Sequence, residues 1–138
     1  MQIVSIPPGA SFPRQRMNKS GTQSLSAPWN GQTVQITGWV ADTTYPGTVV
    51  SNQLVIQKAG VGVTIEAMCE MTGSWSLIQM RLNGSAIAQN NSGGAGTKLA
   101  TATGVTVAVG DTVSLWVQQA GLQSATITAA SYVEARLS

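Results

Sequence analysis

The chain has 138 residues, of which 43% are hydrophobic and only 9% charged, and its net charge is +2. This length suggests one domain with a sizeable core, and so small a charge does not indicate nucleic-acid binding. Because there is no histidine and only one cysteine, the usual general base, an internal disulfide and a cysteine-rich zinc site are excluded, so we expect no catalysis, cofactor or metal.

The N-terminal residues 1–22 differ from the rest of the chain. They hold three of the five prolines and three of the seven basic residues, with no acid. Prolines at this density favour an extended path without regular hydrogen bonding. We therefore expect residues 1–22 to form an extended docking arm outside the core, with a disordered terminus as the alternative. The candidate docking residues of the arm are Ile3, Val4, Ile6, Pro7, Pro8, Phe12, Arg14 and Arg16.

From Gln23 onward the pattern has period two, which is typical of half-buried antiparallel strands. Residues 33–40 alternate, with Val34, Ile36 and Val40 predicted on one face and Trp39 on the other. The clearest predicted strand spans residues 63–71. Its inward side chains should be Val63, Ile65, Ala67, Cys69 and Met71, which makes Cys69 a core residue and not a redox site.

Two dipeptides predict tight turns later in the chain. Asn83-Gly84 favours the left-handed dihedrals of a two-residue hairpin, and in Gly110-Asp111 the aspartate should serve the turn. The strands expected around and after these turns span residues 76–82, 85–88, 98–109, 112–119, 124–128 and 132–137. No stretch has a helical period, so about ten short strands predict an all-β, two-sheet antiparallel sandwich or barrel.

Five segments occur in a distinctive order along residues 23–138. They are GWVADTTYP (38–46), KAGVGVTIEAMCEM (58–71), MRLNGSAIA (80–88), VAVGDTVSLWVQQ (107–119) and SYVEARL (131–137). Each segment alone is common among β proteins. Their order and spacing together resemble the C1q/TNF-like jelly roll as it occurs in tailed-phage virion proteins.

This resemblance implies a jelly-roll β-sandwich at residues 23–138 that assembles as a compact homotrimer. Family members are adhesive or structural heads. This chain has no acidic cluster for calcium and no collagen-like stem, and SYVEARL lacks the aromatic-glycine ending of animal members. The resemblance therefore favours a phage virion component over an animal complement-like protein.

The predicted function is that of a non-enzymatic structural protein of a tailed-phage virion. A minor tail protein, docked by its arm and involved in assembly or host-surface adhesion, is the first interpretation. A capsid decoration or minor capsid protein that stabilises the head shell is the second, and a carbohydrate-binding module is the third. The few charged residues leave sheet edges without gatekeepers, which favours partner subunits.

The expected partners are further copies of this chain, other tail or capsid proteins, and a host surface glycan. Nucleic acid and membrane insertion are not expected, because the charge is small and no apolar run approaches a membrane span. The N-terminus also differs from a secretory signal, since its basic residues follow the apolar part. We therefore expect assembly in the host cytoplasm and a final location in the virion.

Some residues keep two interpretations open. The tryptophans can stack on sugar rings or fill the sandwich and the trimer interface, and the second role is favoured for any one of them. They are Trp29, Trp39, Trp75 and Trp116.

The charged residues give no strong signal of a site. We expect a solvated face for Lys58, Lys98 and Arg81. A carboxylate pair or a serine with a lysine base could still be catalytic, yet among the five acids only Glu66 and Glu70 are close in sequence.

Overall fold

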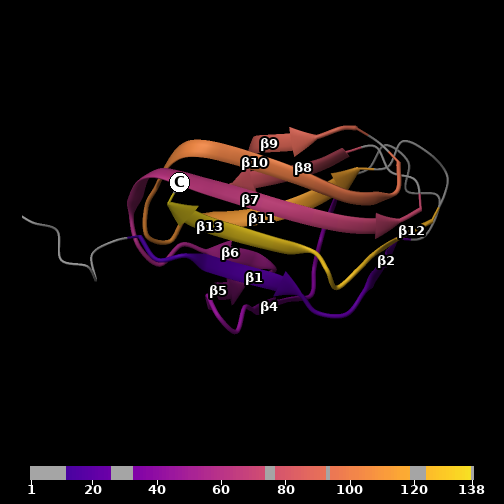
Figure 1. Cartoon of the computed structure of the whole chain (residues 1–138), viewed down its shortest axis with the longest axis horizontal. Coiled ribbons are helices and arrows are strands. Elements are labelled where there is room, and N and C mark those ends of the chain that lie inside the picture. The colour runs from indigo at the N-terminus through magenta and orange to yellow at the C-terminus, as the bar shows by residue number, and fades with distance from the viewer. Residues whose placement is uncertain (1–11, 26–32, 74–76, 93, 119–123, 138) are drawn as a thin grey trace, which may run out of the picture.

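The computed structural model describes residues 12–25, 33–73, 77–92, 94–118 and 124–137, and this part of the chain is a two-layer β-sandwich (Figure 1). Its strands are β1 (Gln15–Lys19), β2 (Gln23–Leu25), β3 (Thr33–Gln35), β4 (Trp39–Ala41), β5 (Thr48–Val50), β6 (Gln53–Val55), β7 (Gly60–Thr72), β8 (Leu77–Leu82), β9 (Ser85–Asn90), β10 (Gly96–Val107), β11 (Thr112–Gln118), β12 (Ala125–Ile127) and β13 (Tyr132–Leu137). No helix among these residues is long and apolar enough to cross a membrane.

The strands form two antiparallel sheets of seven and six strands, which we call sheet A and sheet B. Sheet A has the order β2-β12-β7-β13-β1-β4. The strands β12 and β13 pair with successive parts of one edge of β7, and β10 pairs with the opposite edge. Sheet B has the order β5-β6-β11-β8-β9, with β3 also paired to β11. The expected all-β antiparallel sandwich of two sheets is thus confirmed, with thirteen strands among the described residues in place of about ten.

The core lies between the sheets, and its clearest contributor is β7. All five side chains predicted to point inward from residues 63–71 are at most 1% exposed. Val113, Leu115 and Val117 of β11 cover them from sheet B and are 0% exposed. The period-two pattern therefore identified the inward side chains of β7 and β11 correctly.

Both predicted turns are present. Asn83 and Gly84 have φ of 51° and 85° and join β8 to β9, as a two-residue hairpin requires. Asp111 accepts a hydrogen bond from the Ala108 backbone N–H at 2.8 Å and another from Asn83 Nδ2 at 3.0 Å. These bonds lower the pKa of Asp111, the backbone bond contributing most. Asp111 thus holds the turn before β11.

The predicted arm is wrong for residues 12–22. Residues Gln15–Lys19 form β1, which pairs with β13 on one side and β4 on the other inside sheet A (Figure 1). Met17 is 0% exposed, and Phe12 is 8% exposed beside Gly60. The prediction failed because polar side chains occupy inward positions: Gln15 and Lys19 are 2% and 5% exposed. The sandwich therefore already includes Phe12, and residues 1–11 lie outside the described part.

The face assignment for residues 33–40 is also corrected. Val34 and Ile36 face the core, but Val40 is 49% exposed and Trp39 is 7% exposed. The reason is a change of sheet: β3 belongs to sheet B and β4 to sheet A. Gly38 lies between them with φ of 78°, a dihedral that glycine adopts without strain. The bend reverses the phase of the alternation, so Trp39 points inward.

Candidate functional site

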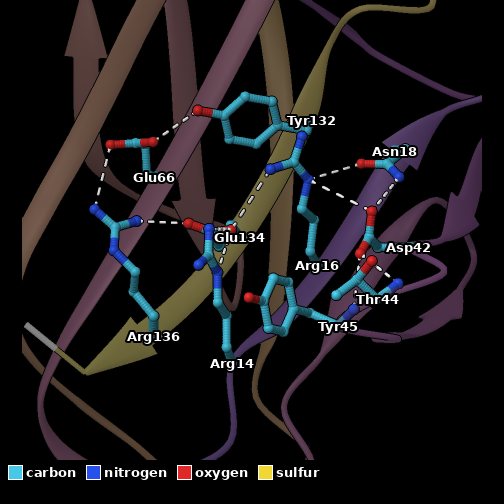
Figure 2. Close-up of polar contacts among 10 residues, drawn as sticks. All are labelled: Arg14, Arg16, Asn18, Asp42, Thr44, Tyr45, Glu66, Tyr132, Glu134 and Arg136. Carbon is cyan, nitrogen blue, oxygen red and sulfur yellow. Dashed lines mark hydrogen bonds and ion pairs between the residues drawn. The ribbon is translucent and has the colours of Figure 1, made fainter.

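The outer face of sheet A carries three arginines and three carboxylates that contact one another (Figure 2). We call this the arginine–carboxylate network. It joins β1, β7, β13 and the segment after β4, and its members are Arg14, Arg16, Asn18, Asp42, Thr44, Tyr45, Glu66, Tyr132, Glu134 and Arg136. The network brings together Arg14 and Arg16, which the sequence predicted as docking residues of a free arm.

Glu134 is the centre of the network and is only 2% exposed. Its Oε1 accepts from Arg14 Nε at 2.8 Å and lies 2.7 Å from Arg14 Nη2, while its Oε2 accepts from Arg136 Nη1 at 2.7 Å. Arg16 Nη1 lies 3.7 Å from the same Oε1. A carboxylate so thoroughly removed from water needs such partners, because an unpaired buried charge is strongly destabilising.

The sheet register places two carboxylates side by side. Glu134 is opposite Glu66 of β7 and opposite Arg16 of β1. Like charges in cross-strand positions repel, and Arg136 offsets this repulsion because it contacts Glu134 and also lies 3.5 Å from Glu66 Oε2. Tyr132 donates a hydrogen bond to the other oxygen of Glu66 at 2.7 Å.

Two tyrosines stack with the arginines. The guanidinium of Arg14 lies 4.3 Å from the ring centroid of Tyr45, and that of Arg16 lies 3.8 Å from the centroid of Tyr132. Burial, followed by the hydrogen bond to Glu66, raises the pKa of Tyr132 to about 12. The network thus holds flat, partly apolar groups in fixed positions on the sheet surface.

Asp42 fixes the segment that carries Tyr45. It accepts from Asn18 Nδ2 at 2.7 Å and from the backbone N–H groups of Thr44 and Tyr45 at 2.9 and 2.7 Å. The bond from Asn18, followed by that from the Tyr45 backbone, lowers the pKa of Asp42. Asp42 therefore has a structural role at the margin of the network.

A largely apolar row crosses the same face and shares Tyr132 and Asn18 with the network. Register aligns Leu99 of β10, Met68 of β7, Tyr132 of β13 and, beyond Asn18, Val40 of β4. Leu99 and Val40 are each 49% exposed. The outer face of sheet A is therefore a broad surface in which apolar and charge-compensated positions are adjacent.

The outer face of sheet B is different. Register aligns Gln35 of β3, Trp116 of β11, Gln79 of β8 and Gln89 of β9 in one row. The guanidinium of Arg81 covers the Trp116 ring at 4.1 Å. Arg81 therefore lies on an outer, solvent-facing surface as expected, and it also makes a stacking contact there that the sequence did not predict.

The structure separates the predicted aromatic candidates. Trp39 is a core residue whose Nε1 donates to the Ile36 carbonyl at 2.8 Å, and Trp116 is half-buried on the outer face of sheet B. Trp29, Trp75 and the candidate arm residues Ile3, Val4, Ile6, Pro7 and Pro8 lie outside the described residues. Cys69 is in the core as predicted, and burial raises the pKa of its thiol to about 12.

Sequence reasoning did not identify Tyr45, Glu66, Tyr132, Glu134 and Arg136 as parts of one site. A signal was present in two strands, where polar residues alternate with residues that face the core. Tyr132, Glu134 and Arg136 lie at every second position of β13, opposite Arg16 and Asn18 of β1. Without the strand order, these two patterns could not be placed side by side.

The described residues form no pocket and no group of three acids or cysteines suited to a metal ion. All three carboxylates of the network contact arginine. The surfaces left to consider in this part of the chain are the outer faces of its two sheets.

No protein-family model and no curated protein sequence matches this chain. Its structure is similar to that of Eiger TNF from S. frugiperda, with a TM-score of 0.57 and 10% sequence identity over 91% of both chains. It is also similar to the carbohydrate-binding module CBM36 in complex with calcium and xylotriose, with a TM-score of 0.44 and 12% identity over 87% of this chain and 92% of that one. The fold is accordingly a TNF-like jelly roll.

Proposed function

We propose that this chain is a non-enzymatic assembly module that forms a homotrimer through the outer face of sheet A. We further propose that the trimer is a structural component of a tailed-phage virion, as a minor tail protein that contributes to assembly or host-surface adhesion. The observation that supports self-association best is the apolar row that crosses this face together with the arginine–carboxylate network. The virion role is supported by the sequence resemblance alone.

The outer face of sheet A has the composition of a protein interface. Interface cores are enriched in tyrosine, methionine and arginine and depleted of lysine. The outward positions here include Met68, Leu99, Tyr132 and three arginines whose charges are compensated by carboxylates. A partner that covers this face would remove exposed apolar surface from water without leaving an unpaired charge.

A three-fold assembly also requires a second surface, because its contacts are heterologous. The long strand β10 offers one at the margin of sheet A. It has 12 residues and, among the described strands, pairs only with β7. Asn90 of β9 donates to the Leu99 carbonyl of this edge at 2.9 Å. An edge without a paired strand is otherwise poorly protected as a free surface, and we propose that the neighbouring copy covers it.

Sedimentation equilibrium of the whole chain tests this assembly. The wild-type protein should have about three times the 14.3 kDa mass of one chain. Leu99→Asp introduces a charge into the apolar row and should shift the protein to monomer. Val50→Asp is the matched control, since Val50 is 55% exposed on β5 of sheet B, and it should remain a trimer.

Circular dichroism should show native β structure for both variants. A wild-type monomer would contradict the trimer, and so would a Leu99→Asp variant that remains a trimer.

The virion role has a separate test. Gold-labelled antibodies against the chain should mark the tails of assembled particles in electron micrographs. Label on the head shell would favour the capsid-decoration role over the tail role. Particles without label on either part would contradict the virion proposal, whatever the oligomeric state.

A further inference from the structure

The charges of the molecule are unevenly divided between its two outer faces. The six strands of sheet B contain no Asp or Glu, and their only charged residue is Arg81. The other three arginines each contact at least one carboxylate in the arginine–carboxylate network. Arg81 has no carboxylate partner among the described residues, so the outer face of sheet B is locally cationic.

Arg81 is held in a defined position although no acid binds it. Its guanidinium stacks on Trp116, and its Nε donates to Gln79 Oε1 at 2.6 Å. Trp116 is itself fixed, because its Nε1 donates at 2.8 Å to the hydroxyl of Ser114, which is 5% exposed. The two terminal nitrogens of Arg81 make no hydrogen bond within the described residues. They form a positioned fork of the kind that binds two oxygens of one anion.

A row of amides extends to both sides of this fork. Gln79 Nε2 donates to Gln89 Oε1 at 3.3 Å, and within the described residues no hydrogen bond involves the Gln89 amide nitrogen at the end of the row. On the other side of Trp116, Gln35 donates to the Asn52 carbonyl at 3.4 Å and keeps its own amide oxygen available. Amides can donate and accept, as neighbouring sugar hydroxyls do.

We propose that the outer face of sheet B binds an acidic glycan, with a carboxylate or sulfate on the Arg81 fork and sugar hydroxyls along the glutamine row. The inference deepens the adhesion role and rests on the proposed function, since association through sheet A leaves sheet B exposed. A glycan is favoured over an acidic peptide because the groups around Arg81 are amides and hydroxyls. The ring that could anchor a peptide side chain, that of Trp116, is covered by Arg81.

Isothermal titration of the whole chain with two pairs of polymers tests this site. Polygalacturonate is compared with its methyl ester, and dextran sulfate with dextran, so the two polymers of each pair share a sugar backbone and differ in whether they carry the anionic group. The wild-type protein should bind at least one charged polymer and neither neutral one. The pair that gives binding identifies carboxylate or sulfate as the anion.

Three variants assign the binding to the fork. Arg81→Gln should weaken it about tenfold or more, the effect of losing one charge-assisted bidentate contact. Arg81→Lys should also weaken it, because an ammonium keeps the charge but not the fork. Lys58→Gln removes the same charge from the segment between β6 and β7 and should bind as the wild type does.

Equal weakening by Lys58→Gln and Arg81→Gln would overturn the site, because it would show attraction to net charge only. Binding of poly-glutamate that depends on Arg81, without binding of either charged glycan, would replace the glycan by a protein partner. No binding by a protein that sediments as a trimer would overturn this inference alone. A wild-type monomer that binds glycan through Arg81 would instead overturn the proposed trimer.

Discussion

The two outer faces of the sandwich hold their arginine side chains in different ways. On sheet A, Arg14, Arg16 and Arg136 converge on Glu134, which is almost completely buried. On sheet B, Arg81 lies on an indole ring, and its one hydrogen-bond partner within the described residues is the amide of Gln79. The first arrangement is closed and internally neutralised, while the second leaves cationic hydrogen-bond donors available.

This difference bears on stability as well as function. On sheet A, charges that neutralise one another stabilise the fold. Removing one of them should therefore lower the free energy of unfolding. An arginine held by stacking contributes little to folding because one face of its contact remains open to water. We therefore expect substitutions on sheet A to affect folding and those on Arg81 to affect binding.

The largest effect should come from Glu134→Gln. The substitution leaves three arginines around a neutral amide, and because their side chains are 28–40% exposed and can be hydrated, the free energy of unfolding should fall by about 2–3 kcal/mol, as when charge-assisted hydrogen bonds are lost. Glu70→Gln is the matched control on the same face, because Glu70 accepts from Thr128 and Thr97 and not from arginine. It should cost under about 1 kcal/mol.

Urea denaturation at one fixed protein concentration measures both variants. If Glu134→Gln and Glu70→Gln lowered the free energy of unfolding by similar amounts, the network would have no special importance for the fold. The expectation that charges on sheet A stabilise the fold would then be wrong.

A smaller effect is expected for Tyr132→Phe, which removes the hydrogen bond to Glu66 and should cost about 1 kcal/mol. The pKa of Tyr132 is raised to about 12 in the folded protein, against about 10 in an unfolded chain. The unfolded state therefore loses its proton first. Wild-type stability should be complete below pH 10 and decline as the pH rises toward 12.

Urea titrations across this alkaline range test the origin of the decline. Tyr132→Phe should show a weaker pH dependence than the wild type. An unchanged alkaline decline in the variant would assign it to other groups.

The smallest effect on stability should come from Arg81→Gln. Loss of an exposed cation–π contact costs at most about 1 kcal/mol, so the thermal midpoint should fall by only a few degrees. Differential scanning calorimetry beside Glu134→Gln gives the comparison directly. If Arg81→Gln lowered the thermal midpoint as much as Glu134→Gln does, Arg81 would be a structural residue. The expected difference between the two faces would then not hold for sheet B.

Much of the fold could be predicted from the sequence because the inward side chains of its long strands are apolar. The alternation in β7 and β11 and the Asn83-Gly84 turn carry their own local signals. β1 could not be recognised in this way, since Gln15 and Lys19 face inward and mask the pattern. The inward Trp39 was missed for another reason, namely the bend at Gly38 that transfers the chain between sheets.

The candidate surfaces were harder to predict than the core. Glu134 lies 120 residues after Arg14, and only the pairing of β1 with β13 brings them together. Arg81 is likewise defined by Trp116 on the neighbouring strand, and nothing within β8 distinguishes it from an ordinary surface arginine. Cross-strand partners depend on register, which a single sequence specifies only through the whole fold.

Hydroxyl-radical footprinting tests the assignment of the two faces most directly, since it measures the solvent exposure of individual side chains. The whole chain should be compared at concentrations where it is dissociated and where it is assembled. The account predicts that assembly protects Met68, Leu99 and Tyr132 on sheet A and leaves the oxidation of Trp116 unchanged. Protection of Trp116 with no change at Met68 and Leu99 would contradict it, because the chains would then associate through sheet B.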